Sequence, residues 1–231
     1  MNNTFTIEES YKTASEINES MSRVYGFMGL ATLISLFVSY VVGSDAELVN
    51  FFFTGWMRYV TIFSPVVAVI LISMALASNP SKEIALFMLM FFASIMGLSF
   101  AVIFAVYTMA SIVNAFMGSA VLFGTMSFYG YFTKQSLDSV GKYAFVALIA
   151  ICIASIVNIF IGSTVMQMVI SAIAILVFLA LTAYDTQQIR EMVSNADATA
   201  ADEVSGALSL YLDFINLFIN LLQIIGIRKD D

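Results

Sequence analysis

The fold is decided by one stretch near the C-terminus, residues 206–226, which read GALSLYLDFINLFINLLQIIG. A helix needs about 20 apolar residues to cross the hydrocarbon core of a bilayer, and this stretch has that length. Asp213 is the one charged residue in it. The stretch therefore predicts a membrane-spanning helix with an acid near its middle.

The polar side chains of this helix share one narrow face. At about 100° per residue they fall within an arc of about 80°, and they are Ser209, Asp213, Asn216, Asn220 and Gln223. A stripe of this kind is unstable against lipid, so it should face a bundle interior or a water-filled cavity. For the amides there is a second interpretation, in which Asn216, Asn220 and Gln223 only form hydrogen bonds between helices.

The rest of the chain repeats the membrane pattern. Of its 231 residues, 61% are hydrophobic and only 11% are charged, against about 25% charged residues in an ordinary soluble domain. Long segments without charge predict an all-α integral membrane protein whose seven spans lie near 24–42, 59–78, 84–106, 110–131, 143–161, 165–185 and 207–226. A soluble globular protein is excluded, because such a chain lacks the polar surface to stay dissolved.

Composition also excludes several kinds of chemistry. Histidine is absent, which removes His-ligated metals and Ser-His-Asp or Cys-His catalysis. Cys152 is the single cysteine and is expected in packed apolar surroundings. The net charge of −7 argues against a nucleic-acid partner. We expect no enzyme activity and no tightly bound cofactor, with the lipid bilayer as the first partner.

The ends of the predicted spans suggest an orientation. Residues 1–22 form a polar, acidic segment without the features of a cleaved signal peptide, and residues 23–231 form the membrane domain. A cytosolic N-terminus places six Lys and Arg residues in the cytosol and three outside, as the positive-inside rule favours. Arg228 and Lys229 are awkward in this scheme, and a last helix that re-enters would resolve them. Residues 190–205 are expected to be a solvated acidic linker.

Two carboxylates carry the functional prediction. Asp213 lies inside the last span, and Asp185 closes the sixth, so both are expected at similar depth on the cytosolic side. If their helices touch, the two groups share one proton, because like charges in a low dielectric do not both ionise freely. The same oxygens suit a hard cation such as Ca²⁺. Asn114 and Asn158 either line this cavity or serve structural hydrogen bonds.

Several motifs resemble one known family. The run from Gly206 to Leu222 is similar to the signature helix of the Bax inhibitor-1 family, in its bacterial branch, and Leu181 to Gln188 resembles that family's sixth-helix motif. Further matches extend the resemblance over most of the chain after about residue 20; they are Phe123-Gly124, Ser127, Tyr129-Gly130-Tyr131, Thr133-Lys134 and the run 154–158.

The resemblance implies both a fold and a function. It implies seven helices in the bacterial inner membrane, with two three-helix layers around the last helix. It also implies a pH-sensitive calcium leak, gated by an aspartate pair that corresponds to Asp185 and Asp213. Some relatives place an arginine at the end of the second helix as a latch. This chain has none there, and Lys82 substitutes only if it reaches back toward the pair.

Two other functions compete with the leak channel. Bacterial relatives are linked to a membrane-bound AAA protease, and the acidic N-terminal segment suits such a partner. Intramembrane aspartyl proteases also use two membrane aspartates, one of them in a Tyr-Asp pair like Tyr184-Asp185. Their second motif, Gly-x-Gly-Asp, is absent here, where the chain reads Leu210-Tyr211-Leu212-Asp213.

Overall fold

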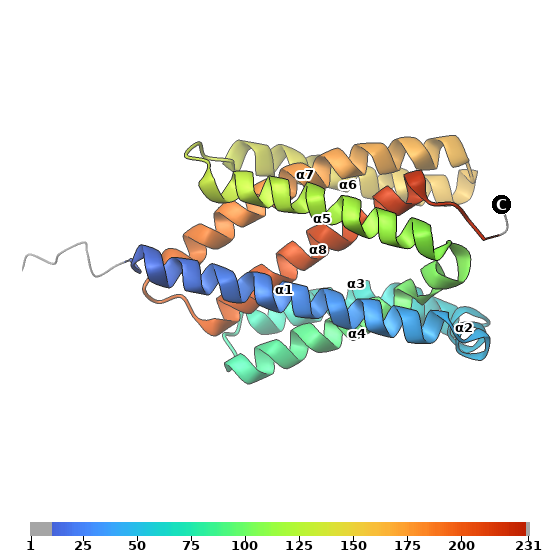
Figure 1. The fold of residues 1–231 in the computed structure, drawn as a ribbon, viewed down its shortest axis with the longest axis horizontal. Coiled ribbons are helices and arrows are strands. Elements are labelled where there is room, and N and C mark those ends of the chain that lie inside the picture. Colours follow the sequence, from blue (N-terminus) through green and yellow to red (C-terminus); the bar gives the residue numbers. More distant parts are fainter. Residues whose placement is uncertain (1–10, 230–231) are drawn as a thin grey trace, which may run out of the picture.

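The computed structural model describes residues 11–229 and consists of α-helices (Figure 1). In chain order they are α1 (Ala14–Gly43), α2 (Ala46–Phe53), α3 (Met57–Leu76), α4 (Lys82–Val106), α5 (Met109–Phe132), α6 (Asp138–Ile161), α7 (Thr164–Ser194) and α8 (Ala200–Ile225). All except α2 are long and apolar enough to cross a membrane. The predicted fold class, an all-α membrane protein with seven spans, is confirmed.

The last helix lies at the centre of the bundle. In Figure 1, α5, α6 and α7 lie on one side of α8, and α1, α3 and α4 lie on the other. Helix α8 contacts α1, α4, α5 and α7 and buries more residues than any other described helix. The reason is its sequence, which is apolar on nearly every face and carries small residues where neighbours approach.

Polar side chains also tie α8 to the α1–α4 layer. Ser35 of α1 donates to the carbonyl oxygen of Ala93 on α4 at 2.7 Å, and its hydroxyl lies 2.6 Å from that of Tyr211 on α8. Tyr211 is fully buried. Within a membrane, a buried hydroxyl needs such a partner, so this contact fixes the register of three helices at once.

Helix boundaries differ from the sequence prediction where capping residues act. Helix α1 begins at Ala14, well before residue 23, because Thr13 and Glu16 form a capping box. Residues 1–10 of the predicted N-terminal segment lie outside the described residues. The unpredicted α2 begins after Asp45, whose side chain accepts from the backbone N–H groups of Glu47 and Leu48.

The predicted linker over 190–205 is mostly helical, so that expectation is wrong. Helix α7 continues to Ser194, and α8 begins at Ala200 behind a capping box of Thr199 and Asp202. Glu203, expected to be solvated, is 5% exposed and pairs with Arg23 of α1 at 2.6 Å. A cation partner on another helix is not visible from local charge patterning.

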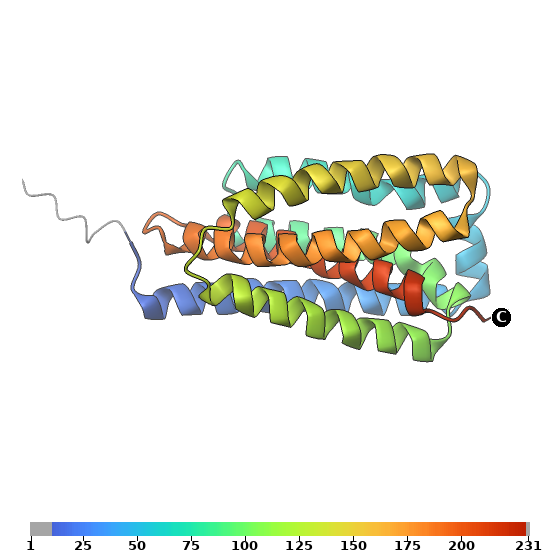
Figure 2. The ribbon, with the colours of Figure 1, turned by 90° about the horizontal axis from the view of Figure 1, so that it is seen from above.

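Helix α8 crosses the whole bundle, so it is not re-entrant. Its C-terminal end lies opposite the start of α1 (Figures 1 and 2). There the Nζ of Lys229 donates to the carbonyl oxygen of Phe104 at 2.6 Å, and the N–H of Ile227 donates to Ser111 Oγ at 2.9 Å. A lysine at the C-terminal end of α4 satisfies a carbonyl that has no partner within the helix.

Helices α5 and α7 approach each other closely at Gly130. A Cβ atom there would overlap the carbonyl oxygen of Ala183 on α7. We expect Gly130→Ala to lower the free energy of unfolding by about 1–3 kcal/mol, because the helices must separate to accept the methyl group. Unfolding of the detergent-solubilised protein measures this. Gly124→Ala is the matched control on α5, since its Cβ would meet no atom within 4 Å. Equal losses in the two variants would contradict the explanation.

Candidate functional site

Asp185 and Asp213 line one cavity. The cavity has a volume of about 970 Å³ and lies between α3, α6, α7 and α8. Helices α3 and α6 do not pack against each other along their described lengths, which leaves room for this space. Its lining is mostly apolar and includes Val66, Val69, Phe145, Leu148, Phe178, Leu181 and Leu212. Polar side chains are therefore a minority of the lining.

Asp213 is the most constrained of these polar groups. It lies near the middle of α8 and is 4% exposed. Its Oδ2 atom is fully buried and has no hydrogen-bond partner among the described residues. An unpartnered buried carboxylate is costly, so the group has to be protonated or has to meet a cation or a water molecule.

Asp185 is the second acid of the cavity. It lies nine residues before the end of α7, and its side chain lines the same cavity as that of Asp213. Asp185 is only partly buried. In a mostly apolar cavity each charge acts on the other, and this coupling disfavours the doubly ionised state.

Lysine 142 is the third charged residue of the lining. It comes from the beginning of α6 and is exposed. Sequence reasoning missed it, although its place just before the start of a predicted span was a usable signal. Lys82 is not part of the lining. Its Nζ lies 5.9 Å from the centre of the Phe27 ring, so the structure does not bring it to the aspartate pair.

The polar stripe of α8 divides into two parts. Ser209 and Asn216 line the cavity with Asp213. Asn216 Nδ2 donates to the carbonyl oxygen of Leu212 at 2.8 Å, and Asn220 Nδ2 donates to that of Asn216 at 2.9 Å. The hydrogen bonds of these two amide groups are therefore made within their own helix. Beyond them, α8 packs into an apolar cluster with residues Phe104, Ile112, Ala115, Phe218 and Leu222.

A separate amide network occupies the far end of the stripe. Gln223 Oε1 accepts from Gln167 Nε2 at 2.7 Å and from Ser171 Oγ at 2.6 Å, both on α7. Asn158 Nδ2 donates to Gln167 Oε1 at 3.1 Å. Asn158 and Gln223 are therefore both hydrogen-bonded to Gln167, away from the cavity lining. Gln167 was a missed signal, a lone amide within an apolar span.

Asn114 lies elsewhere. It is exposed on α5, a helix that contributes nothing to the lining of the cavity. Of the predicted site residues, the cavity therefore collects Asp185, Asp213, Ser209 and Asn216. Cys152 also lines it and is exposed, so the expectation of packed surroundings for this thiol is wrong, because α6 is an outer helix that buries few of its residues.

Comparison with known proteins agrees with this architecture. The model of the family described as "Inhibitor of apoptosis-promoting Bax1" matches residues 17–230. The chain belongs to the Bax inhibitor-1 family. Its seven spans and central α8 are the arrangement that the resemblance implied.

Bacterial relatives match over nearly the full length. The Inner membrane protein YbhL of Escherichia coli K12 is 36% identical over 214 residues, which cover 90% of this chain and 92% of YbhL. An uncharacterised protein of Rickettsia prowazekii is 32% identical over 231 residues, 98% of each chain. An uncharacterised membrane protein of Streptococcus pyogenes is 34% identical over 219 residues, 93% of this chain and 94% of the relative.

The cavity of this Bax inhibitor-1 family member offers few anionic ligands. Over residues 11–229 no three Asp, Glu, Cys or His side chains gather closely enough to hold a metal ion. A cation between Asp185 and Asp213 would therefore have at most two carboxylates. Calcium takes six to eight oxygen ligands, so amide oxygens and water would have to supply the rest.

Proposed function

We propose that this protein is a pH-sensitive leak channel for cations, chiefly Ca²⁺, gated by Asp185 and Asp213. One observation carries the proposal: a fully buried carboxylate oxygen of Asp213, without a hydrogen-bond partner among residues 11–229, lies in a cavity that Asp185 also lines. Acids at mid-membrane are costly and commonly mark ion or proton paths. A purely structural role would have left the carboxylate paired.

The gating step is a change in the charge of the pair. When the pair holds one proton it carries a single negative charge, and when it holds two protons it is neutral; in both states α7 stays against α8. When the proton leaves, two negative charges face each other in an apolar cavity, and their repulsion favours separation of the helices. The negative site then admits a cation, so the leak rises with pH.

The ligand set suits a transported ion. Asp185, Asp213 and the side-chain oxygen of Asn216 are hard donors of the kind that Ca²⁺ prefers. Two carboxylates bind more weakly than the larger sets of high-affinity sites, and conduction requires an ion to leave as well as to enter. Calcium is thus cargo here, and protons are the regulator.

We place the protein in the bacterial inner membrane with a cytosolic N-terminus. The relative YbhL is named an inner membrane protein. The order of the seven spans puts Lys12, Arg23, Lys82, Lys134, Lys142 and Arg190 at the end where α1 begins. Arg58, Arg228 and Lys229 lie at the other end, and the positive-inside rule favours the richer end in the cytosol.

Calcium flux from proteoliposomes tests the proposal. Purified protein is reconstituted with a calcium dye inside the vesicles, and influx is followed between pH 6 and pH 8. Below the midpoint, the ionised fraction changes up to about tenfold per pH unit, and influx should rise accordingly above that of protein-free vesicles. Influx equal to that of empty vesicles at every pH would end the proposal.

Lys142 sets a further expectation. Its positive charge lines the cavity with the two acids and repels a cation that enters. Lys142→Met should therefore raise calcium influx at high pH several-fold, measured in the same vesicles. Lys142→Arg keeps the charge and is the matched control. Influx that is unchanged in the methionine variant would exclude Lys142 from the path.

Two alternatives remain predictions with their own tests. If the protein acts mainly as a partner of a membrane AAA protease, deleting residues 1–10 should change its turnover and leave calcium flux intact. If it were an aspartyl protease, Asp185→Asn and Asp213→Asn would each abolish cleavage of a membrane substrate. The absence of Gly-x-Gly-Asp makes the second alternative the weaker one.

A further inference from the structure

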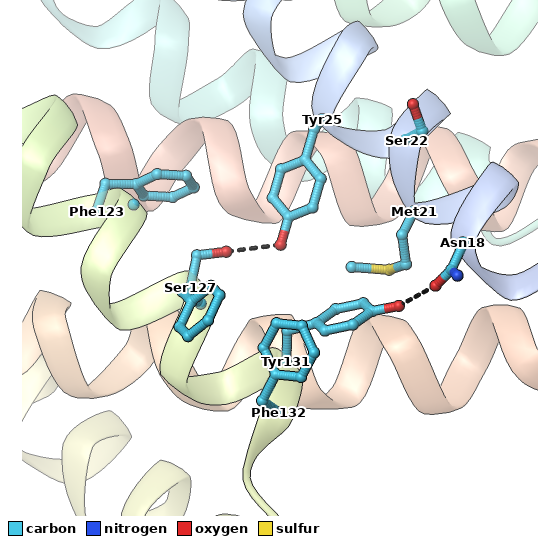
Figure 3. Close-up of a pocket in the computed structure, with 10 residues that line it drawn as sticks. Asn18, Met21, Ser22, Tyr25, Phe123, Ser127, Tyr131 and Phe132 are labelled. Carbon is cyan, nitrogen blue, oxygen red and sulfur yellow. Dashed lines mark hydrogen bonds between the residues drawn. The ribbon is translucent and has the colours of Figure 1, made fainter. Parts of the chain in front are cut away.

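A second cavity lies on the other side of the bundle, between α1 and α5 (Figure 3). Its volume is about 540 Å³, within the range of about 300–1,000 Å³ that ligand pockets span. Asn18, Ser22 and Tyr25 line it from α1, and Phe123, Gly124, Ser127, Phe128, Tyr131 and Phe132 line it from α5. We call this space the α1–α5 groove.

We expect the α1–α5 groove to face the bilayer. Helices α1 and α5 make no close backbone contact over the described residues and are bridged by side-chain hydrogen bonds, so the groove is a gap between two candidate membrane spans. It starts where α5 ends, at the level of Asn18 and Tyr131, and runs inward to Phe123. Its mouth is thus at the head-group level and its inner part in the hydrocarbon.

The floor of the groove is polar although its walls are apolar. The hydroxyls of Tyr25 and Ser127 lie 2.6 Å apart, and Ser127 Oγ lies 2.9 Å from Thr186 Oγ1 on α7. At the mouth, the Tyr131 hydroxyl donates to Asn18 Oδ1 (Figure 3). Polar groups beside an apolar channel match the ester region and the acyl chain of a lipid.

Two cations lie close to the mouth in the fold, although neither is part of the lining. The guanidinium of Arg190 lies 5.0 Å from the centre of the Tyr131 ring, and Lys134 is exposed in the segment that follows α5, two residues after Phe132. Neither cation forms a salt bridge within residues 11–229. The nearby acids of α1 are engaged, because Glu16 completes the capping box and Glu19 pairs with Arg23.

We propose that the α1–α5 groove binds one anionic phospholipid, with an acyl chain along Gly124 and the phosphate between Arg190 and Lys134. The proposal commits to a lipid because the groove opens into the bilayer and combines a cationic mouth, a hydroxyl floor and apolar walls. A phosphate head group pairs with Arg and Lys at a membrane surface. This inference is independent of the proposed channel function.

Gly124 offers a position at which the groove can be filled to test the proposal. A Cβ atom at this position meets nothing within 4 Å, so Gly124→Leu fills the groove without forcing helices apart. Ala150→Leu on exposed α6 is the control for an added side chain. The full-length protein is delipidated in detergent, incubated with phosphatidylglycerol or with phosphatidylcholine of the same chains, and examined by native mass spectrometry.

Wild type and Ala150→Leu should retain one phosphatidylglycerol, and Gly124→Leu should lose at least about nine-tenths of it, equivalent to a tenfold weaker affinity. Arg190→Gln should erase the preference for phosphatidylglycerol over phosphatidylcholine. Retention by Gly124→Leu equal to that of wild type overturns the proposal. Equal retention of both lipids by wild type overturns the anionic head-group site. A second copy of the chain bound in place of lipid overturns the choice of occupant.

Discussion

We expect Asp213→Asn to abolish the proposed pH dependence of calcium influx and to hold the flux at the low level expected of wild type in acid. Asparagine keeps the size of the side chain but never carries the charge, so the pair with Asp185 cannot become doubly negative. The expected loss is large, because the driving repulsion disappears entirely. The measurement is dye-reported influx into proteoliposomes between pH 6 and pH 8.

The control for this variant lies on the same stripe. Asn220 belongs to α8 and bonds to a backbone carbonyl of its own helix, outside the cavity lining. Asn220→Ala should leave the pH profile in place. Asp213→Asn should also unfold no more easily than wild type, because it replaces a buried, unpartnered carboxylate with a neutral group. A loss of calcium flux in Asp213→Asn is then not explained by unfolding of the protein.

Asp185→Asn completes the experiment. It should flatten the profile as well, because either aspartate is needed for the doubly charged state. A pH response that persists unchanged in both asparagine variants would remove the gating mechanism and leave only the membrane fold. A response lost in one variant alone would assign the titration to a single acid and reject the shared proton.

Arg23→Ala should destabilise the protein by about 1–3 kcal/mol. Arg23 Nε and Nη2 donate to the two carboxylate oxygens of Glu203 at 2.8 Å and 2.6 Å, and Nη2 also donates to Ser20 Oγ at 3.0 Å. Glu203 is buried, and removal of its partner leaves a charge without compensation. Unfolding in detergent, followed by circular dichroism with increasing denaturant, measures the loss.

Two further variants separate the effect of the Arg23–Glu203 pair from that of surface charge. Glu19→Gln removes the other acid bound by Arg23, but Glu19 is 73% exposed, so the loss should stay below about 1 kcal/mol. Adding Glu203→Gln to Arg23→Ala should restore part of the stability, because no unpaired charge remains. If the double variant is less stable than Arg23→Ala, the explanation by an uncompensated carboxylate is wrong.

Much of the architecture was predictable because each membrane span carries its own signal. Hydrocarbon demands long apolar segments, and these were read directly from the spacing of charges. The ends were less predictable. Thr13 and Thr199 each start a helix earlier than the apolar segment does, because a capping box extends a helix into water without any hydrophobic signal.

The site was predictable only in part. Asp213 was predictable as a site residue, because the cost of an acid in an apolar span must be offset by its surroundings. The roles of Lys142 and of the Arg23–Glu203 pair were not predictable, because each of these residues looks like an ordinary charge at the end of a span. Asn114, Asn158, Asn220 and Gln223 share the polarity of the cavity residues but not their position. Polarity along one helix does not say which neighbour it will meet.

The sequence by itself determined the membrane class, the seven spans, the family and the two acids, since each follows from local composition or from a continuous motif. The tertiary structure decided which polar groups share a cavity, that Lys142 rather than Lys82 lines it, and that α1 and α5 leave a groove. The physical reason is that packing depends on side-chain volumes at helix contacts far apart in the chain. A pattern within one helix fixes the face to be buried, but not the residues that cover it.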